Sequence, residues 1–251
     1  MDSTKTRRID NVDWRLGTYV LAIPVILFYV LGLTGCVSNS PGISNIYMTQ
    51  LQMGGNPNVT SGTHVNVGYF GICVKDERGS SCLASSKTTS DKLIAKFANG
   101  TGDGKATPKD MKTLETLIPV ALTIQTKIIL CLPAVSGVLF ALALICVTLL
   151  KRHLKTTGNA SATRQRRWFK RAAMNTSWSS VAFSLASVVA LHQTTSALAY
   201  TTNVISSEVH MRSGVALRVL GWLAFSFSAL FAFGVSTIFK VQDGTIKSAG
   251  T

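Results

Sequence analysis

Four long uncharged stretches decide what this chain can fold into. They occupy residues 16–34, 128–150, 178–200 and 217–239, and the only charged residue among them is Arg218, near the start of the last. About 20 apolar residues, each rising ~1.5 Å along a helix, cross the ~30 Å hydrocarbon core of a bilayer. Soluble proteins rarely bury four such helices. The sequence therefore predicts an all-α membrane fold with a four-transmembrane helix bundle.

The first stretch has an alternative interpretation. Lys5, Arg7 and Arg8 precede it, as in a signal peptide, and residues 33–36 resemble a bacterial lipoprotein cleavage box. However, its 19 apolar residues exceed the roughly 7–15 of a signal core, and basic residues also precede a retained helix. We expect a retained first helix, with cleavage as the alternative.

Basic residues predict the orientation. Residues 1–15 and 151–173 are rich in Lys and Arg, and 151–173 contains no acidic residue, so both are expected in the cytoplasm. The predicted domains are a cytoplasmic N-terminus at 1–15, membrane helices at 16–34, 128–150, 174–200 and 214–239, a large extracellular loop at 35–127, a basic cytoplasmic loop at 151–173, a short extracellular loop at 201–213 and a cytoplasmic C-terminus at 240–251.

Composition and motifs argue against several classes of function. Charged residues make up only 14% of the chain, and its net charge of +14 is concentrated between the apolar stretches rather than spread over a soluble surface. The chain lacks a Gly-rich phosphate loop and the His and Cys spacing of a metal site. We therefore expect no enzyme, catalytic residue, cofactor, metal site or nucleic-acid partner, although calcium remains possible as a transported or regulating ion.

The large outer loop contains three cysteines on the expected oxidising side. Residues 65–74 read as a β-strand that enters a polar turn, and eight residues separate Cys73 from Cys82. A hairpin disulfide between Cys73 and Cys82 is the expected arrangement, with two free thiols as the alternative. Cys36 is left over, either unpaired at the membrane edge or bridged to another chain.

These residues carry a family resemblance. The motif residues are Cys36, Ser40, Pro41 and Gly42 after the first apolar stretch, then Gly68, Tyr69, Phe70, Gly71, Cys73 and Cys82. The second group resembles the Gly-Leu-Trp-x-x-Cys signature of the claudin-like superfamily, with an aromatic pair in place of the tryptophan. Both groups are similar to the fungal family of mating-induced calcium regulators and membrane-fusion proteins.

The resemblance implies a function and a fold. It implies a multi-pass plasma-membrane protein linked to low-affinity calcium influx, cell fusion during mating and polarised growth. The alternatives are a structural scaffold of a membrane domain or cell contact, and an oligomeric calcium-permeable channel. Expected partners are membrane lipids and other membrane or cell-surface proteins, with a homo-oligomer as a further option. The fold would add a small extracellular β-sheet, claudin-like, that continues towards residues 201–213. Independently, Leu114, Leu117, Ile118 and Leu122 keep helical spacing, which predicts an extracellular extension of the second helix through residues 114–127.

The sequence offers few residues for a calcium pathway. None of the four apolar stretches contains Asp or Glu, so carboxylates would have to come from the loops. Possible ion-related residues are Asp103, Asp110, Glu115 and His192. Residues 99–110 partly imitate a calcium-binding loop, but a Gly-rich linker explains them better. Ordinary solvated acids are the alternative for Asp110 and Glu115, and interhelical hydrogen bonding or contact with the outer-loop backbone is the alternative for His192.

Two further predictions concern packing and lipid contact. Ser180, Ser184 and Ser187 share one face of the third helix, where small polar residues let helices approach and hydrogen-bond. Tyr69 and Phe70 are adjacent, so one ring is expected to pack inward and the other to reach outward. The inner loop places an aromatic pair among cations expected to bind anionic headgroups, or only to set topology: Arg164, Arg166, Arg167, Lys170 and Arg171.

The orientation generates the first testable prediction. Sequons begin at Asn58 and Asn99 on the expected outside, and at Asn159 and Asn175 on the expected inside. Glycosidase treatment should lower the apparent mass of the parent chain, and replacing both Asn58 and Asn99 with Gln should abolish that shift. The matched Asn159→Gln and Asn175→Gln variants should behave like the parent. A glycan on either inner site would reverse the orientation.

Overall fold

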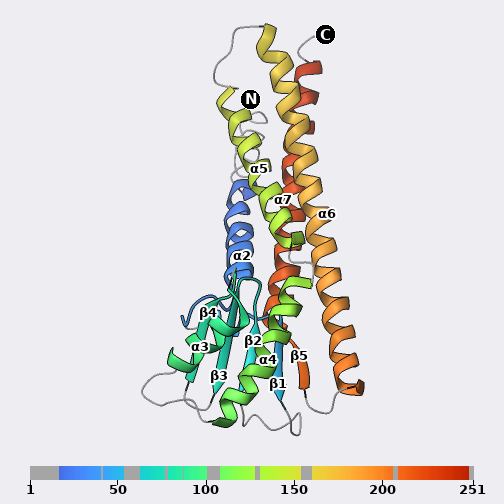
Figure 1. The fold of residues 1–251 in the computed structure, drawn as a ribbon. Coiled ribbons are helices and arrows are strands. Elements are labelled where there is room, and N and C mark those ends of the chain that lie inside the picture. Colours follow the sequence, from blue (N-terminus) through green and yellow to red (C-terminus); the bar gives the residue numbers. More distant parts are fainter. Residues whose placement is uncertain are drawn as a thin grey trace. The chain divides into compact units, whose positions relative to one another are not determined.

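The structure, a computed structural model, describes residues 17–40, 42–53, 63–76, 79–86, 88–100, 108–127, 131–153, 160–205 and 209–248. The chain divides into two compact units, which we describe separately. One comprises residues 1–29, 132–186 and 222–251, and the other comprises residues 30–131 and 187–221. Figure 1 shows the elements of both units coloured along the chain.

Four of the described helices are long and apolar enough to cross a membrane. The apolar segments run over Gly17–Thr34, Leu132–Leu150, Trp168–Leu198 and Val215–Phe239. They belong to α2 (Ala22–Thr34), α5 (Cys131–His153), α6 (Ala160–Ile205) and α7 (Val215–Ser248). The predicted number of apolar helices is confirmed. Two of the helices extend well beyond their predicted apolar stretches, α6 at its start and α7 at its end.

Aromatic and aliphatic side chains form the core of the first unit. The Phe140 and Phe231 rings pack edge to face with centroids 5.1 Å apart. Val25 and Phe231 are completely buried. Apolar side chains on other faces of these helices are exposed, as expected for helices whose surroundings are lipid rather than water: Val20, Ile23, Val138, Ile145, Leu230 and Phe233 are examples.

Hydroxyl groups connect three helices inside this unit. Tyr29 and Ser136 share a hydrogen bond of 2.6 Å between their hydroxyls. Ser136 donates to the Ser180 carbonyl over 2.8 Å, and Ser180 donates back to the Ser136 carbonyl over 3.0 Å. Ser180 and Ser184 of this unit are buried, as is Ser187 in the second unit, which confirms the predicted packing face. Interhelical bonds of this kind contribute on the order of 0.6 kcal/mol each in a membrane.

The second unit contains a five-stranded antiparallel sheet. Its strands are β1 (Thr49–Met53), β2 (His64–Val67), β3 (Gly71–Asp76), β4 (Gly79–Ala84) and β5 (Val209–Ser213). Their order in the sheet is β4-β3-β2-β1-β5. Thr49 pairs with Ser213, so the segment between the third and fourth apolar helices supplies the fifth strand. The prediction that the sheet continues into residues 201–213 is confirmed.

Two helices cover one face of this sheet. The helix α4 (Pro108–Lys127) lies against β1 and β2, and α3 (Ser90–Gly100) lies against α4 (Figure 1). α4 contains the helix predicted through residues 114–127. Its buried stripe packs with one side of each strand, where residues alternate as the pleat requires. The largest contributors are Leu51, Val65, Ile72, Leu93, Phe97, Leu117 and Ile118.

Candidate functional site

The aromatic residues of the Gly-x-x-Gly motif lie in the turn between β2 and β3. β2 ends at Val67, β3 begins at Gly71, and the Gly68 N–H donates to the Gly71 carbonyl over 2.8 Å. We call residues 68–71 the motif turn. The prediction of one strand over residues 65–74 was therefore wrong, because the bond between the two glycines closes a hairpin inside that stretch.

Tyr69 and Phe70 face opposite ways, as predicted. Tyr69 is 7% exposed and belongs to the core under the sheet, whereas Phe70 is 40% exposed. Burial raises the pKa of Tyr69 to about 12, opposed by the neighbouring Ser187 hydroxyl of α6. The phenol therefore stays protonated at physiological pH.

Residues 35 and 36 cross over the motif turn at backbone contact distance. A Cβ atom added at Gly68 would lie 2.4 Å from the Gly35 carbonyl oxygen, and one added at Gly71 would lie 1.9 Å from the Cys36 carbonyl oxygen. Neither position can hold a side chain without moving the backbone above it. The glycines of the motif are thus explained by the crossing, which starts directly after α2 ends at Thr34.

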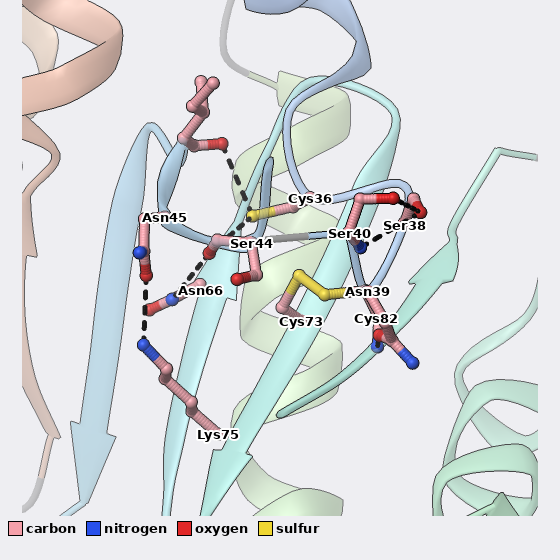
Figure 2. The surroundings of a disulfide bond; sticks show 11 residues. Cys36, Ser38, Asn39, Ser40, Ser44, Asn45, Asn66, Cys73, Lys75 and Cys82 are labelled. Carbon is pink, nitrogen blue, oxygen red and sulfur yellow. Dashed lines mark hydrogen bonds between the residues drawn. A yellow bond between two sulfur atoms is a disulfide. The ribbon is translucent and has the colours of Figure 1, made fainter. Parts of the chain in front are cut away.

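The segment that follows the crossing lies over the second face of the hairpin. We call residues 36–47 the strap; Pro41 lies outside the described residues. Asn39 Oδ1 accepts from the Cys82 N–H, and Asn45 Oδ1 accepts from Lys75 Nζ over 3.0 Å. Figure 2 shows these side chains converging on the two strands. The two motif groups therefore form one cluster.

A disulfide joins Cys73 to Cys82 beneath the strap, with Cα atoms 4.0 Å apart. The two residues pair across β3 and β4, which confirms the predicted hairpin bridge. Cys36 is a free thiol with no exposed surface. Its Sγ donates to the carbonyls of Ser44 and Ile46 at 3.8 and 3.5 Å. Burial raises the pKa of Cys36 to about 12, opposed by Lys75. This buried position disfavours the expected alternative of a bridge to another chain.

Gln125 of α4 holds the motif turn from below. Its Nε2 donates to the carbonyls of Gly68 and Tyr69 over 3.0 and 2.7 Å. Its Oε1 accepts from the Ser85 hydroxyl over 2.7 Å. All of these bonds are buried. The motif turn is therefore fastened to the end of α2 by the crossing, to α4 by Gln125 and to α6 by Ser187.

The chain matches a known family over residues 52–241, which is 190 of its 251 residues. That family is described as the Ca2+ regulator and membrane fusion protein Fig1. The chain belongs to this family. A search of curated protein sequences finds none that matches. The match covers the motif turn, the disulfide and the last three apolar helices, whereas the strap lies ahead of it.

Of the predicted ion-related residues of this Fig1-family chain, the structure describes the side chains of Glu115 and His192. Glu115 on α4 and His192 on α6 are both exposed. Asp103 and the side chain of Asp110 lie outside the described residues. Where the chain is described, no group of three or more His, Cys, Asp or Glu side chains can hold a metal ion.

The predicted modification and headgroup residues are placed only in part. Asn99 lies in α3 and Asn58 outside the described residues. In the basic segment, Lys170 Nζ donates to the Phe239 carbonyl over 3.4 Å, and Arg171 is exposed. The segment belongs to α6 rather than to a loop, and three of its side chains are outside the description: Arg164, Arg166 and Arg167.

Two residues of the site, Gln125 and Asn39, were not predicted from the sequence. Gln125 follows Leu117, Ile118 and Ala121 on the buried stripe of α4. A lone amide on an apolar helical face was therefore the available signal, since buried polar groups require partners. Asn39 offered no such signal, because its role depends on where the strap meets an edge strand.

The Gln125 contacts generate the second prediction. Gln125→Leu keeps a side chain of similar length but leaves buried polar partners without their bonds. We expect the free energy of unfolding to fall by about 2–4 kcal/mol, because leaving buried polar groups unsatisfied is costly. The measurement is the thermal unfolding midpoint of the purified full chain in detergent.

The neighbouring Thr126→Ala is the matched control for this prediction. Thr126 is exposed and bonds only to carbonyls of its own helix, so its loss should change the midpoint little. Equal unfolding midpoints for the Gln125 variant and the parent would contradict the role of Gln125 in holding the motif turn.

Proposed function

We propose that this chain regulates calcium entry and cell–cell membrane fusion at the plasma membrane through its outer sheet, with the motif turn as the coupling element. Membership of the Ca2+ regulator and membrane fusion family carries the general function. The observation that supports the coupling role is the fastening of one turn to three helices. A contact made by the sheet would therefore reach α2, α4 and α6 through residues 68–71.

The physical path runs through short, specific contacts. The end of α2 continues into the crossing, where the backbone of residues 35 and 36 is in direct contact with that of the motif turn. The Tyr69 side chain lies beside Ser187 of α6, and Gln125 holds the carbonyls of the turn's first two peptide bonds. Displacement of the turn would break buried hydrogen bonds or move these helices. Rigid contacts of this kind transmit a shift better than a flexible loop would.

An orientation with both termini in the cytoplasm is part of this proposal. It is supported by the basic residues at 1–15 and 151–173 and by the disulfide in segment 35–127, because disulfides persist on the oxidising side of a membrane. The setting of fungal mating or polarised growth, and the claudin-like relationship, rest on the resemblance of the sequence motifs.

A regulatory role fits the chemistry of the helices better than a pore within one chain. None of the apolar stretches contains a carboxylate, and the hydroxyls of Tyr29, Ser136 and Ser180 bond to one another or to helix carbonyls. A calcium path through such helices would lack the acidic rings that select cations. The regulated pathway would then belong to a partner membrane protein.

Phe70 supplies the third prediction, which tests this function. Phe70→Ala should leave surface abundance unchanged but lower calcium uptake and fusion several-fold, because the ring is exposed on a firmly held turn. Tyr69→Ala should instead lower surface abundance, because it empties a buried site beside Ser187 of α6. Surface abundance and calcium uptake are measured in the same cells during mating.

Tyr200→Ala provides the control for Phe70, since Tyr200 is an exposed aromatic residue of the same unit and lies outside the motif turn. It should match the parent in both measurements. If Phe70→Ala reaches the surface and takes up calcium like the parent, the contact role of the turn is wrong and a scaffold function takes precedence.

A further inference from the structure

Three cysteines meet in one buried cluster, although only two of them are bonded. Cys36, Cys73 and Cys82 pack together with Tyr47 beside them. Cys36 comes from the strap, Cys73 from the inner strand β3 and Cys82 from the edge strand β4 (Figure 2). A thiol packed against a disulfide is a potential attacking group, because disulfides exchange partners through attack by a thiolate.

The geometry favours Cys73 over Cys82 as the sulfur that Cys36 would reach. The Cys36 backbone lies on Gly71, and Cys73 is two residues further along the same face of β3. The Ser44 carbonyl accepts from both the Cys36 thiol and the Asn66 amide, and Asn66 pairs with Cys73 across the sheet. On the far side, the strap meets Cys82 through Asn39 rather than through Cys36.

We propose that Cys36 is a latent exchange partner of the hairpin disulfide, which converts to a Cys36–Cys73 bridge when the strap lifts. The Cys36 thiolate attacks Cys73 Sγ, the Cys73–Cys82 bond breaks, and Cys82 leaves as a thiolate that takes up the proton lost by Cys36. One disulfide and one thiol are present before and after, so the step requires no outside oxidant or reductant. The inference goes beyond the proposed function and does not depend on it.

While the strap remains packed on the hairpin, it prevents this exchange. The Cys36 thiol is fully buried and donates to two carbonyls, and burial raises its pKa to about 12. Since the thiolate is the reactive form, the closed cluster is inert at neutral pH. Lifting the strap exposes the thiol to water and restores its acidity. The bonds from Asn39 to Cys82 and from Asn45 to Lys75 therefore act as latches.

Exchange would change what the outer sheet presents. It would tie the start of the strap covalently to β3, while β4 would lose its covalent link to β3. The thiol would pass to Cys82, which at 8% exposure is closer to the surface than fully buried Cys36. The sheet would then have a reactive thiol on its edge strand.

The test uses the purified full chain in detergent micelles without added thiol or oxidant. The protein is held at pH 8.5 in increasing sub-denaturing urea, quenched with N-ethylmaleimide and mapped by mass spectrometry. We expect a Cys36–Cys73 peptide together with alkylated Cys82 to accumulate as the strap opens. Alkylated Cys36 with an intact Cys73–Cys82 bridge at every urea concentration that opens the strap would overturn the proposal, as would a Cys36–Cys82 peptide as the main product.

Two sets of variants sharpen this test. Asn45→Ala removes a latch and should speed the exchange about three- to tenfold, whereas Thr88→Ala, which removes an exposed local bond, should leave the rate unchanged. In Cys82→Ser, oxidised glutathione should produce a Cys36–Cys73 bridge. In the matched Cys73→Ser, both remaining outer thiols should stay alkylatable. Failure of Cys82→Ser to form the bridge while remaining folded contradicts the proposed geometry.

Discussion

The second unit depends on one constraint. Where residues 35 and 36 cross over the motif turn, the two backbones are in direct contact. Atoms at Gly68 and Gly71 approach the crossing chain so closely that no Cβ fits at either position. This approach puts the strap directly on β2 and β3, buries Cys36 against the disulfide and joins the end of α2 to the sheet. A larger residue at either glycine would separate these parts, because the opposing atoms are backbone and cannot rotate away.

At this crossing, some backbone N–H and carbonyl groups have no hydrogen-bond partner within the sheet. Side chains supply those partners instead. The Gly68 and Tyr69 carbonyls accept from Gln125, and the Cys82 N–H on edge strand β4 donates to Asn39. Buried backbone groups without partners are costly, and uncovered edge strands invite pairing with other chains. The amides of Gln125 and Asn39 therefore stabilise the site and also cover one end of its sheet.

Local patterns in the sequence predicted the local structure well. The apolar stretches, the helix through residues 114–127 and the bridge between Cys73 and Cys82 follow from periodicity or spacing, and the continuation of the sheet into residues 201–213 followed from the family resemblance. The hairpin inside residues 65–74 was missed because Tyr69 and Phe70, aromatic residues typical of strands, occupy its turn. The surroundings of Cys36 and the clamp at Gln125 were missed for a different reason, since each is set by contacts between distant segments.

The distribution of chemistry between the two units bears on how a protein of this family can act on calcium. In the first unit, the hydroxyls of Tyr29, Ser136 and Ser180 are engaged in bonds that hold helices together, which suits packing rather than ion passage. The second unit combines an exposed aromatic ring, a covalently closed hairpin and a turn fastened to three helices. The regulation proposed above therefore assigns recognition and coupling to the second unit, through its exposed ring and its fastened turn.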